Sequence, residues 1–285
     1  MRKTWLRCAA WLPPFVVAVT LAAISLAQSP AAKPKLPPGV DPGGAVIGLI
    51  TTGIDYTRPE IERCLARDGE GELIGWDIVD RDRLPYKRQT TPAQPSDDAL
   101  FNSLPCGKVR VVPVRVDPTN AVTLGKAMAF LAATTARVVV LPVESQPVDW
   151  APLIAAAMQF PTLLLVIAVG DVPLSPGSGA PAASASIETL TVRVAAAVLN
   201  DGHLSLAGVR EGMLIDLAVL MPRASVAEHA MRSQAAILSA MTLVCKLKAA
   251  GRSPQSGAEM RAALIALGKA DAALLKYPLL APSCS

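Results

Sequence analysis

Histidine is nearly absent from this chain, which has only His203 and His229 among its 285 residues. Any catalytic base that relies on an imidazole must therefore be one of these two. His203 follows Asn200-Asp201-Gly202, a run typical of a hairpin turn, so we expect it to be a solvated turn residue. His229 precedes Ser233 by four residues, so their side chains could share one face of a helix.

Aromatic residues are also scarce, at 4%, although hydrophobic residues make up 52% of the chain. This composition predicts a packed core of Ala, Val, Leu and Ile and argues against disorder. The formal charge is +4, with Arg2, Lys3 and Arg7 near the N-terminus, and no basic stripe interleaved with aromatics is present. We therefore expect no nucleic-acid partner. Neither a nucleotide-binding loop nor a zinc-ligand spacing occurs, so no cofactor and no metal are expected.

The N-terminus has the pattern of a secretory signal peptide. Its three basic residues precede an apolar run over residues 8–24, and Ser25-Leu26-Ala27 places small residues where signal peptidase requires them. We expect residues 1–27 to be removed before Gln28. The mature protein would then be periplasmic or secreted.

An uncleaved inner-membrane anchor is the alternative, because about 20 apolar residues can span a bilayer. Pro13-Pro14 disfavours a continuous helix in this segment. The membrane would be a partner only in that case. Residues 28–44 contain five prolines and are expected to form an extended linker.

Four cysteines remain after the apolar run: Cys64, Cys106, Cys245 and Cys284. An even number of cysteines in an oxidising compartment favours two disulfides. Three pairings are possible. We favour Cys64–Cys106 and Cys245–Cys284, because each pair would close a loop of moderate length.

From residue 45 onward, short apolar runs alternate with longer helical patterns. Strands are expected at residues 45–50, 73–79, 109–116, 138–141, 163–168, 191–197 and 215–219. Helices are expected at residues 60–66, 97–104, 121–134, 149–159, 227–250 and 257–268. The continuously apolar strands are typical of a sheet buried on both faces. The alternation predicts a three-layer α/β fold with a mainly parallel sheet flanked by helices, and a site at the carboxyl ends of the strands.

The first of these strands carries a recognisable pattern. Residues 46–55 read Val-Ile-Gly-Leu-Ile-Thr-Thr-Gly-Ile-Asp, and Arg58-Pro59-Glu60-Ile61 follows; residues 75–80 read Gly-Trp-Asp-Ile-Val-Asp. In this order and separation, these segments resemble the first catalytic segment of the subtilisin-like serine peptidases. There a strand ends in Asp-Thr-Gly-Ile-Asp, and a Gly-Trp-Asp-Phe-Val-Asp segment comes later. The resemblance reaches about residue 270 and implies a subtilisin-like domain at residues 45–285.

The resemblance also assigns the family's catalytic positions to this sequence. Thr51 stands where the family has the triad Asp, and Ser96 where it has the His. Asp171 takes the place of the Asn in the oxyanion hole. Ser233, in Met231–Ala236, stands where the family has the nucleophile of Gly-Thr-Ser-Met-Ala, with Ser225 and Ser239 as alternative registers.

These residue types are unsuited to peptide hydrolysis. The family's mechanism needs a serine nucleophile, a histidine base and a carboxylate that orients the histidine. A threonine at 51 and a serine at 96 supply neither the carboxylate nor the base. An ionised Asp171 would add negative charge where the transition state develops it. Asp97 and Asp98 are expected to be first-turn charges that favour the dipole of a helix.

We therefore assign no catalytic role to the four family-equivalent positions. We interpret the chain as an exported pseudoenzyme with a degenerate triad. Its cleft would bind a peptide or protein, for instance by strand addition, or the fold would serve as a scaffold. The alternative is an active serine hydrolase with a rearranged site that uses Ser233 and His229.

Overall fold

A computed structural model describes residues 32–87, 97–147, 150–169, 185–201, 203–210, 213–221, 228–270 and 277–284. The described residues from Lys33 onward belong to one compact unit. The expected signal peptide, Ser96, Asp171 and Ser225 lie outside the described residues. No helix among the described residues is long and apolar enough to cross a membrane.

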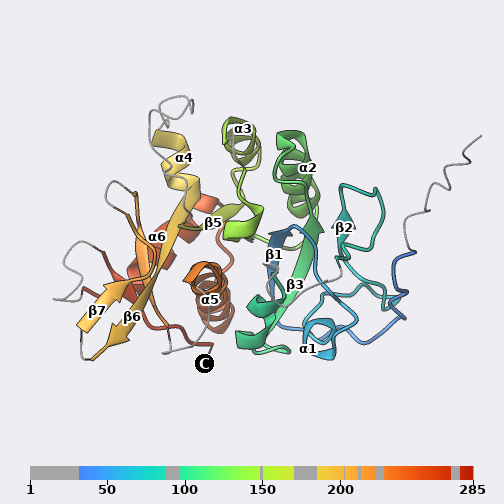
Figure 1. Cartoon of the computed structure of the whole chain (residues 1–285), viewed down its shortest axis with the longest axis horizontal. Helices are drawn as coiled ribbons and strands as arrows, with labels where there is room; N and C mark the ends of the chain where they lie inside the picture. Colours follow the sequence, from blue (N-terminus) through green and yellow to red (C-terminus); the bar gives the residue numbers. More distant parts are fainter. Residues whose placement is uncertain are drawn as a thin grey trace, which may run out of the picture. The chain divides into compact units, whose positions relative to one another are not determined.

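The unit is built on one sheet in which neighbouring strands run in the order β2-β3-β1-β4-β5-β6-β8-β9 (Figure 1). The strands are β1 Ala45–Thr51, β2 Trp76–Asp77, β3 Val109–Arg115, β4 Val138–Leu141, β5 Leu164–Ala168, β6 Thr191–Asn200, β7 His203–Leu206, β8 Leu217–Met221 and β9 Leu279–Leu280. All pairs are parallel except β6–β7, an antiparallel hairpin in which Asn200 is opposite His203.

The strands alternate between two apolar faces. Ile47 and Leu49 of β1 share a cluster with Ile237 of α5 (Glu228–Ala249). Ile50 belongs to a second cluster with Leu124 of α2 (Ala121–Ala132). Because successive strand residues point to opposite faces, the continuously apolar sequence of β1 fills both layers.

The remaining helices complete the two layers. Clusters of buried side chains place α5 and α6 on one face of the sheet, and α2 and α3 on the other (Figure 1). The other helical elements are α1 Pro59–Glu62, η1 Asp97–Ser103, η2 Val143–Ser145, α3 Ala151–Gln159, α4 Ala185–Leu190 and α6 Gly257–Leu267. The expected three-layer, mainly parallel α/β architecture is confirmed.

The N-terminal part of this unit packs closely on the sheet. Residues 33–44 fall in the segment expected to be a linker, yet the Tyr56 hydroxyl donates to the Pro34 carbonyl. The Asp41 carboxylate accepts from the Arg67 backbone N–H at 2.8 Å and pairs with the Arg110 guanidinium. These contacts place the segment from Lys33 onward in the same compact unit as the domain.

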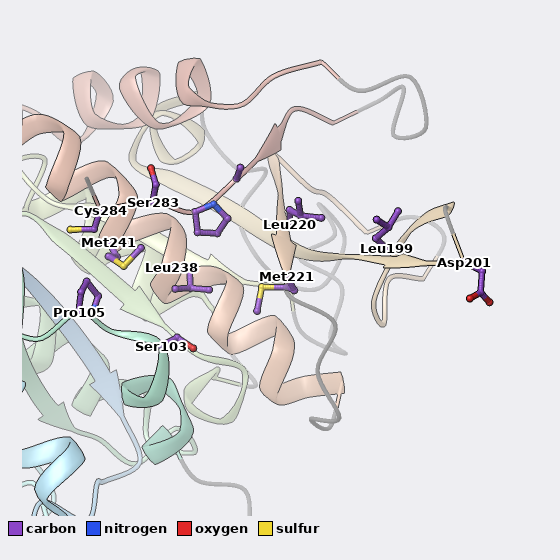
Figure 2. Close-up of a pocket in the computed structure, with 12 residues that line it drawn as sticks. Ser103, Pro105, Leu199, Asp201, Leu220, Met221, Leu238, Met241, Ser283 and Cys284 are labelled. Atoms are coloured by element: carbon purple, nitrogen blue, oxygen red, sulfur yellow. The ribbon is translucent and has the colours of Figure 1, made fainter.

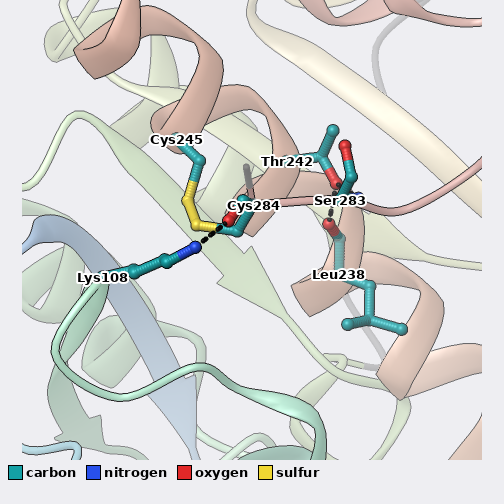
Figure 3. The surroundings of a disulfide bond; sticks show 6 residues. All are labelled: Lys108, Leu238, Thr242, Cys245, Ser283 and Cys284. Carbon is teal, nitrogen blue, oxygen red and sulfur yellow. Dashed lines mark hydrogen bonds between the residues drawn. A yellow bond between two sulfur atoms is a disulfide. The ribbon is translucent and has the colours of Figure 1, made fainter.

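The two expected disulfides are confirmed. Cys64 pairs with Cys106 and Cys245 with Cys284, at Cα–Cα distances of 4.8 and 5.3 Å. The second bond joins α5 to the C-terminal segment, where the Lys108 ammonium also donates to the Cys284 carbonyl at 2.7 Å (Figure 3). The C-terminal segment is therefore held against the α5 face of the sheet.

A buried ion-pair cluster fixes α6 to the amino ends of β6 and β8. Arg193 donates to Asp216 through its backbone N–H, Nε and Nη2, at 2.7 to 2.9 Å. Arg261 of α6 donates to the same carboxylate at 2.8 Å. Burial raises the pKa of Asp216, but the Arg193 hydrogen bonds and the two positive charges outweigh it, so the pKa is lowered.

We predict that Asp216→Asn destabilises the protein in a pH-dependent way. The lowered pKa means that the carboxylate contributes stability above about pH 4, and this contribution is lost as the pH falls through the folded-state pKa. Urea unfolding at pH 7 should show a loss of about 3 kcal/mol, because two guanidinium groups lose a buried charged partner.

The difference between Asp216→Asn and the unsubstituted protein should shrink when both are unfolded near pH 3. Asp201→Asn is the matched control, since Asp201 is exposed at the hairpin turn. Its φ of 48° suits asparagine as well as aspartate. A difference for Asp216→Asn that is unchanged at low pH would contradict the prediction.

Candidate functional site

The candidate site lies where β1 and β4 end. Thr51 is the last residue of β1, and the short turn η2 follows β4. Ser233 lies in the second turn of α5, which packs against both strands and against η2. Carboxyl ends of neighbouring parallel strands meet at one edge of the sheet, which is why residues distant in the sequence come together here.

Thr51 is hydrogen-bonded to a carboxylate that the sequence analysis did not select. Its Oγ1 donates to Oδ2 of Asp97 at 2.6 Å. Both side chains are buried, with 0% and 1% of their surface exposed. The same Oδ2 accepts from the Thr52 backbone N–H at 3.4 Å, while the Gly53 N–H donates to Thr51 Oγ1 at 3.0 Å. The end of β1 and the start of η1 are therefore joined by a hydrogen bond from the Thr51 hydroxyl to the Asp97 carboxyl group.

The turn η2 links this pair to Ser233. Ser145 Oγ donates to Asp97 Oδ2 at 3.3 Å, and the Val143 N–H donates to Ser233 Oγ at 3.0 Å. Ser233 is 2% exposed. Ser239, one of the alternative registers, is also buried but donates to the Ala236 carbonyl of its own helix at 2.8 Å. Of these two serines, Ser233 is the one that reaches the turn beside Asp97.

Asp98 is the second acid beside the expected His position. Its Oδ1 accepts from the Asp55 backbone N–H at 3.0 Å, and its Oδ2 lies 3.5 Å from an Arg58 guanidinium nitrogen. Asp97 and Asp98 lie in the first turn of η1, as expected, and both side chains are also buried, which the sequence did not indicate. They hold η1 to the segment that follows β1.

The two histidines differ in what the structure describes. His203 begins β7 and is exposed beside the turn of the β6–β7 hairpin, as expected. His229 lies on α5, one helical turn before Ser233, so the predicted spacing on one helix is present. The side chain of His229 lies outside the described part of the structure.

An ionic cluster supports the backbone next to Thr51. The Lys33 ammonium contacts Asp77, Asp80 and Asp82, at 2.5, 2.9 and 3.0 Å. Arg115, the last residue of β3, pairs with Asp77 at 2.8 Å and with Asp80 at 2.6 Å.

The cluster shifts the pKa of its members. Burial lowers the pKa of Lys33 and of Arg115, but hydrogen bonds to Asp77 and Asp80 outweigh this effect, so both values are raised. The hydrogen bond from Lys33 is the main cause that lowers the pKa of Asp80. Arg115 Nε also donates to the Thr52 carbonyl at 3.3 Å, which ties the cluster to the candidate site.

A large groove lies elsewhere on the α5 face. It has a volume of about 970 Å³, and Figure 2 shows it between α5, the carboxyl ends of β6 and β8, and the C-terminal segment. The residues that line it include neither Thr51, Asp97 nor Ser233. No cluster of His, Cys, Asp and Glu in the described residues has an arrangement suited to a metal ion.

Two contact residues were missed for different reasons. Asp97 directly follows Ser96, so an acid pair at the expected His position was a visible signal. Ser145 follows β4 in a segment with no distinguishing pattern, and only the fold brings it to Asp97. The fold brings Thr51 and Ser233 to the turn η2. Ser96 and Asp171 lie outside the described residues.

We predict that Asp97→Ala lowers the free energy of unfolding by about 3 kcal/mol, because buried hydroxyls lose a charged or polar acceptor. Asp97→Asn keeps an oxygen that can accept from Thr51 and should cost less than half as much. Thermal and urea unfolding of both variants would measure this. If both variants lost the same free energy of unfolding, the Thr51 hydrogen bond would not be the stabilising contact of Asp97.

Comparison with known proteins gives matches among solved structures. No protein-family model and no curated protein sequence matches this chain. A lanthipeptide protease matches with a TM-score of 0.50 and 11% identity, over 86% of this chain and 87% of that chain. The PatG macrocyclase in complex with peptide matches with a TM-score of 0.51 and 13% identity, over 84% of this chain and 88% of that chain.

A cold adapted subtilisin-like serine proteinase is also similar, with a TM-score of 0.49 and 14% identity, over 87% of this chain and 92% of that chain. At such low identities, structural matches concern the fold alone. Element order, parallel pairing and the matches to the lanthipeptide protease and the PatG macrocyclase agree with the fold that the sequence resemblance implies. The chain therefore has the α/β fold of these two structures.

Proposed function

We propose that this protein is an exported, catalytically inactive member of the subtilisin-like fold that binds a peptide or protein segment. The observation that carries the proposal is the hydrogen bond between Thr51 and Asp97. It joins a hydroxyl and a carboxyl at a place where the family's chemistry requires a carboxylate and an imidazole.

The Thr51–Asp97 pair is unsuited to general base catalysis on Ser233. The family's mechanism uses an imidazole to remove the proton of the serine hydroxyl, and a carboxyl group in contact with Thr51 does not supply one. The described contacts direct Asp97 Oδ2 toward hydroxyls of Thr51 and Ser145. These contacts give the carboxyl group a structural role at the edge of the sheet.

The surroundings of Ser233 also favour inactivity. Its Oγ accepts a hydrogen bond from the Val143 N–H, and its side chain is almost completely buried. A serine nucleophile needs a base that removes its proton and an open path to the substrate carbonyl. Burial of Ser233 opposes the second requirement in this structure.

Binding of a peptide does not depend on these residues. The PatG macrocyclase has a similar fold, and its structure was solved in complex with peptide. An extended peptide can bind an open strand or loop through backbone hydrogen bonds alone, so loss of a triad leaves this property intact. A purely structural scaffold is the alternative if no peptide binds.

Export is supported by the cysteines and by the N-terminal pattern. Disulfides persist in oxidising compartments, and the four cysteines of the domain form two of them. The basic, apolar and small-residue sections of residues 1–27 match a signal peptide. A periplasmic or secreted location follows from the two features together.

A second candidate function is an active serine hydrolase that uses Ser233 with His229. The specific observation in its favour is that both residues lie on α5, one helical turn apart. In this arrangement the imidazole would have to replace the missing base from the same helix as the nucleophile.

We predict that a fluorophosphonate probe does not label the purified mature protein above the level of its Ser233→Ala variant. The reason is that Ser233 is buried and that Asp97, rather than a histidine, contacts Thr51. Labelling is measured by mass spectrometry of intact protein. Ser239→Ala is the matched control, because Ser239 is a buried serine on the same helix.

Labelling that Ser233→Ala abolishes and Ser239→Ala preserves would overturn the inactive assignment. If His229→Ala also abolished it, the rearranged hydrolase would be the correct function. A trypsin-like peptidase labelled in parallel verifies the probe.

We predict that the exported protein begins at Gln28. Signal peptidase cleaves after small residues, and Ser25 and Ala27 occupy the required positions. Mass spectrometry of the N-terminal peptide, after expression in a bacterium and fractionation of its envelope, measures this. Recovery of residues 1–27 on protein in the membrane fraction would instead establish an anchor.

A further inference from the structure

A second hollow lies on the opposite edge of the sheet from Thr51 and Ser233. It has a volume of about 500 Å³ and is lined by Ala45 and Val138, at the amino ends of β1 and β4. Val46 of β1 and Leu247 of α5, both partly exposed, form apolar parts of its wall. Because α5 runs antiparallel to the strands, its start lies at the candidate site and its end at this hollow.

Three cationic side chains line the hollow: Arg137, Lys248 and Arg252. All three are exposed, and none of the lining residues is acidic. Within the described part of the chain none of the three forms an ion pair. Other described arginines do pair with carboxylates, namely Arg58, Arg67, Arg110, Arg115, Arg193 and Arg261.

Local hydrogen bonds position the guanidinium of Arg137. Nη1 of Arg137 donates to the carbonyls of Thr134 and Ala136 at 3.0 and 2.8 Å. A guanidinium held in this way loses less conformational entropy when it binds a ligand.

Arg252 is positioned by the end of α5. The Gly251 N–H donates to the Lys248 carbonyl at 3.1 Å and the Arg252 N–H to the Leu247 carbonyl at 2.9 Å. Gly251 has a φ of 60°, as the C-terminal turn of a helix requires. The turn brings Lys248 and Arg252 to the same hollow.

The dipole of α5 explains the positions of only two of the three cations that line the hollow. Cations are favoured at the C-terminus of a helix, which accounts for Lys248 and Arg252. Arg137 belongs to the connection between α2 and β4, so no such effect places it here. Glu259 of α6 lies beside the hollow, but its carboxylate accepts from the Gln255 N–H and does not line it.

We propose that this hollow binds an amphipathic organic anion, with a phosphate group on the cations and an aliphatic part on the apolar wall. Guanidinium groups suit the paired oxygens of a phosphate, and three unpaired cations favour a group with more than one negative oxygen. The volume falls within the range of ligand sites and exceeds what a bare oxyanion needs. The apolar wall then accommodates the remainder of the ligand.

Titration calorimetry with hexyl phosphate tests the site on the purified full domain. We expect saturable binding that Lys248→Glu and Arg252→Glu each weaken about tenfold or more, since each places a negative charge beside the phosphate. Lys126→Glu is the matched control: Lys126 is an exposed lysine on α2 and does not line the hollow. All three substituted residues are exposed, and a melting temperature close to that of the unsubstituted protein verifies folding.

Several outcomes would overturn the proposal. Hexyl phosphate that does not bind saturably, or Lys126→Glu that weakens binding as much as Lys248→Glu, would show that the cations form no site. Inorganic phosphate that binds as tightly as hexyl phosphate would refute the role of the apolar wall.

Vesicles distinguish two sources of this ligand chemistry. Sedimentation with phosphatidylglycerol vesicles, absent with phosphatidylcholine vesicles and lost in Lys248→Glu, would assign the site to a lipid headgroup. Binding of hexyl phosphate without binding to vesicles would assign it to a soluble phosphate ester. Either result supports the phosphate chemistry, and neither depends on whether the protein is an enzyme.

Discussion

Burial of the sheet on both faces is the constraint on which the other features depend. β1 lies between β3 and β4, and its apolar side chains fill two separate clusters. A strand in this position has no face on which a charged side chain meets solvent. Polar groups are therefore confined to the two ends of the strands, which is where the candidate site and the cationic hollow lie.

Polar side chains are stabilised differently at the two edges of the sheet. At the carboxyl edge Thr51, Asp97 and Ser233 are buried, so each has a hydrogen bond with a neighbouring segment. At the amino ends of β1 and β4, the three cations of the hollow remain exposed and have no carboxylate partner in the described part of the chain. Burial without a partner would cost several kcal/mol at the first edge, whereas water solvates the charges at the second. The exposed cations of the hollow are therefore accessible to the anionic ligand proposed above.

The sequence predicted those parts of the fold that depend on long apolar runs. β4 was predicted with its observed bounds, and β1 with a difference of one residue. The strand expected at residues 73–79 is observed only as the two-residue strand β2. The two-residue strand β9 was not predicted, because it depends on pairing with β8, which local composition does not encode. The short helix α4 (Ala185–Leu190) was also absent from the prediction, because six residues give too little periodicity to recognise.

Site residues were predictable only where a family pattern covered them. Thr51 belongs to the strand-turn segment with the clearest resemblance, and Ser233 to a helix of the expected length. Asp97 was interpreted as a first-turn charge of a short helix, and that position is correct, but its burial was not predicted. Its burial is determined by residues of β1 and η2 that are far away in the sequence, and a local argument contains no information about them.

The residues at positions 51 and 97 are physically dependent on each other. Oγ1 of Thr51 lies 2.6 Å from the carboxylate of Asp97, and both side chains are buried. An aspartate at position 51, as in the peptidase pattern, would face a second carboxyl group at about the same distance. Two carboxylates this close cannot both be ionised in a buried site. A threonine that donates a hydrogen bond is compatible with a buried Asp97. An aspartate at position 51 would therefore require a residue other than a carboxylate at position 97.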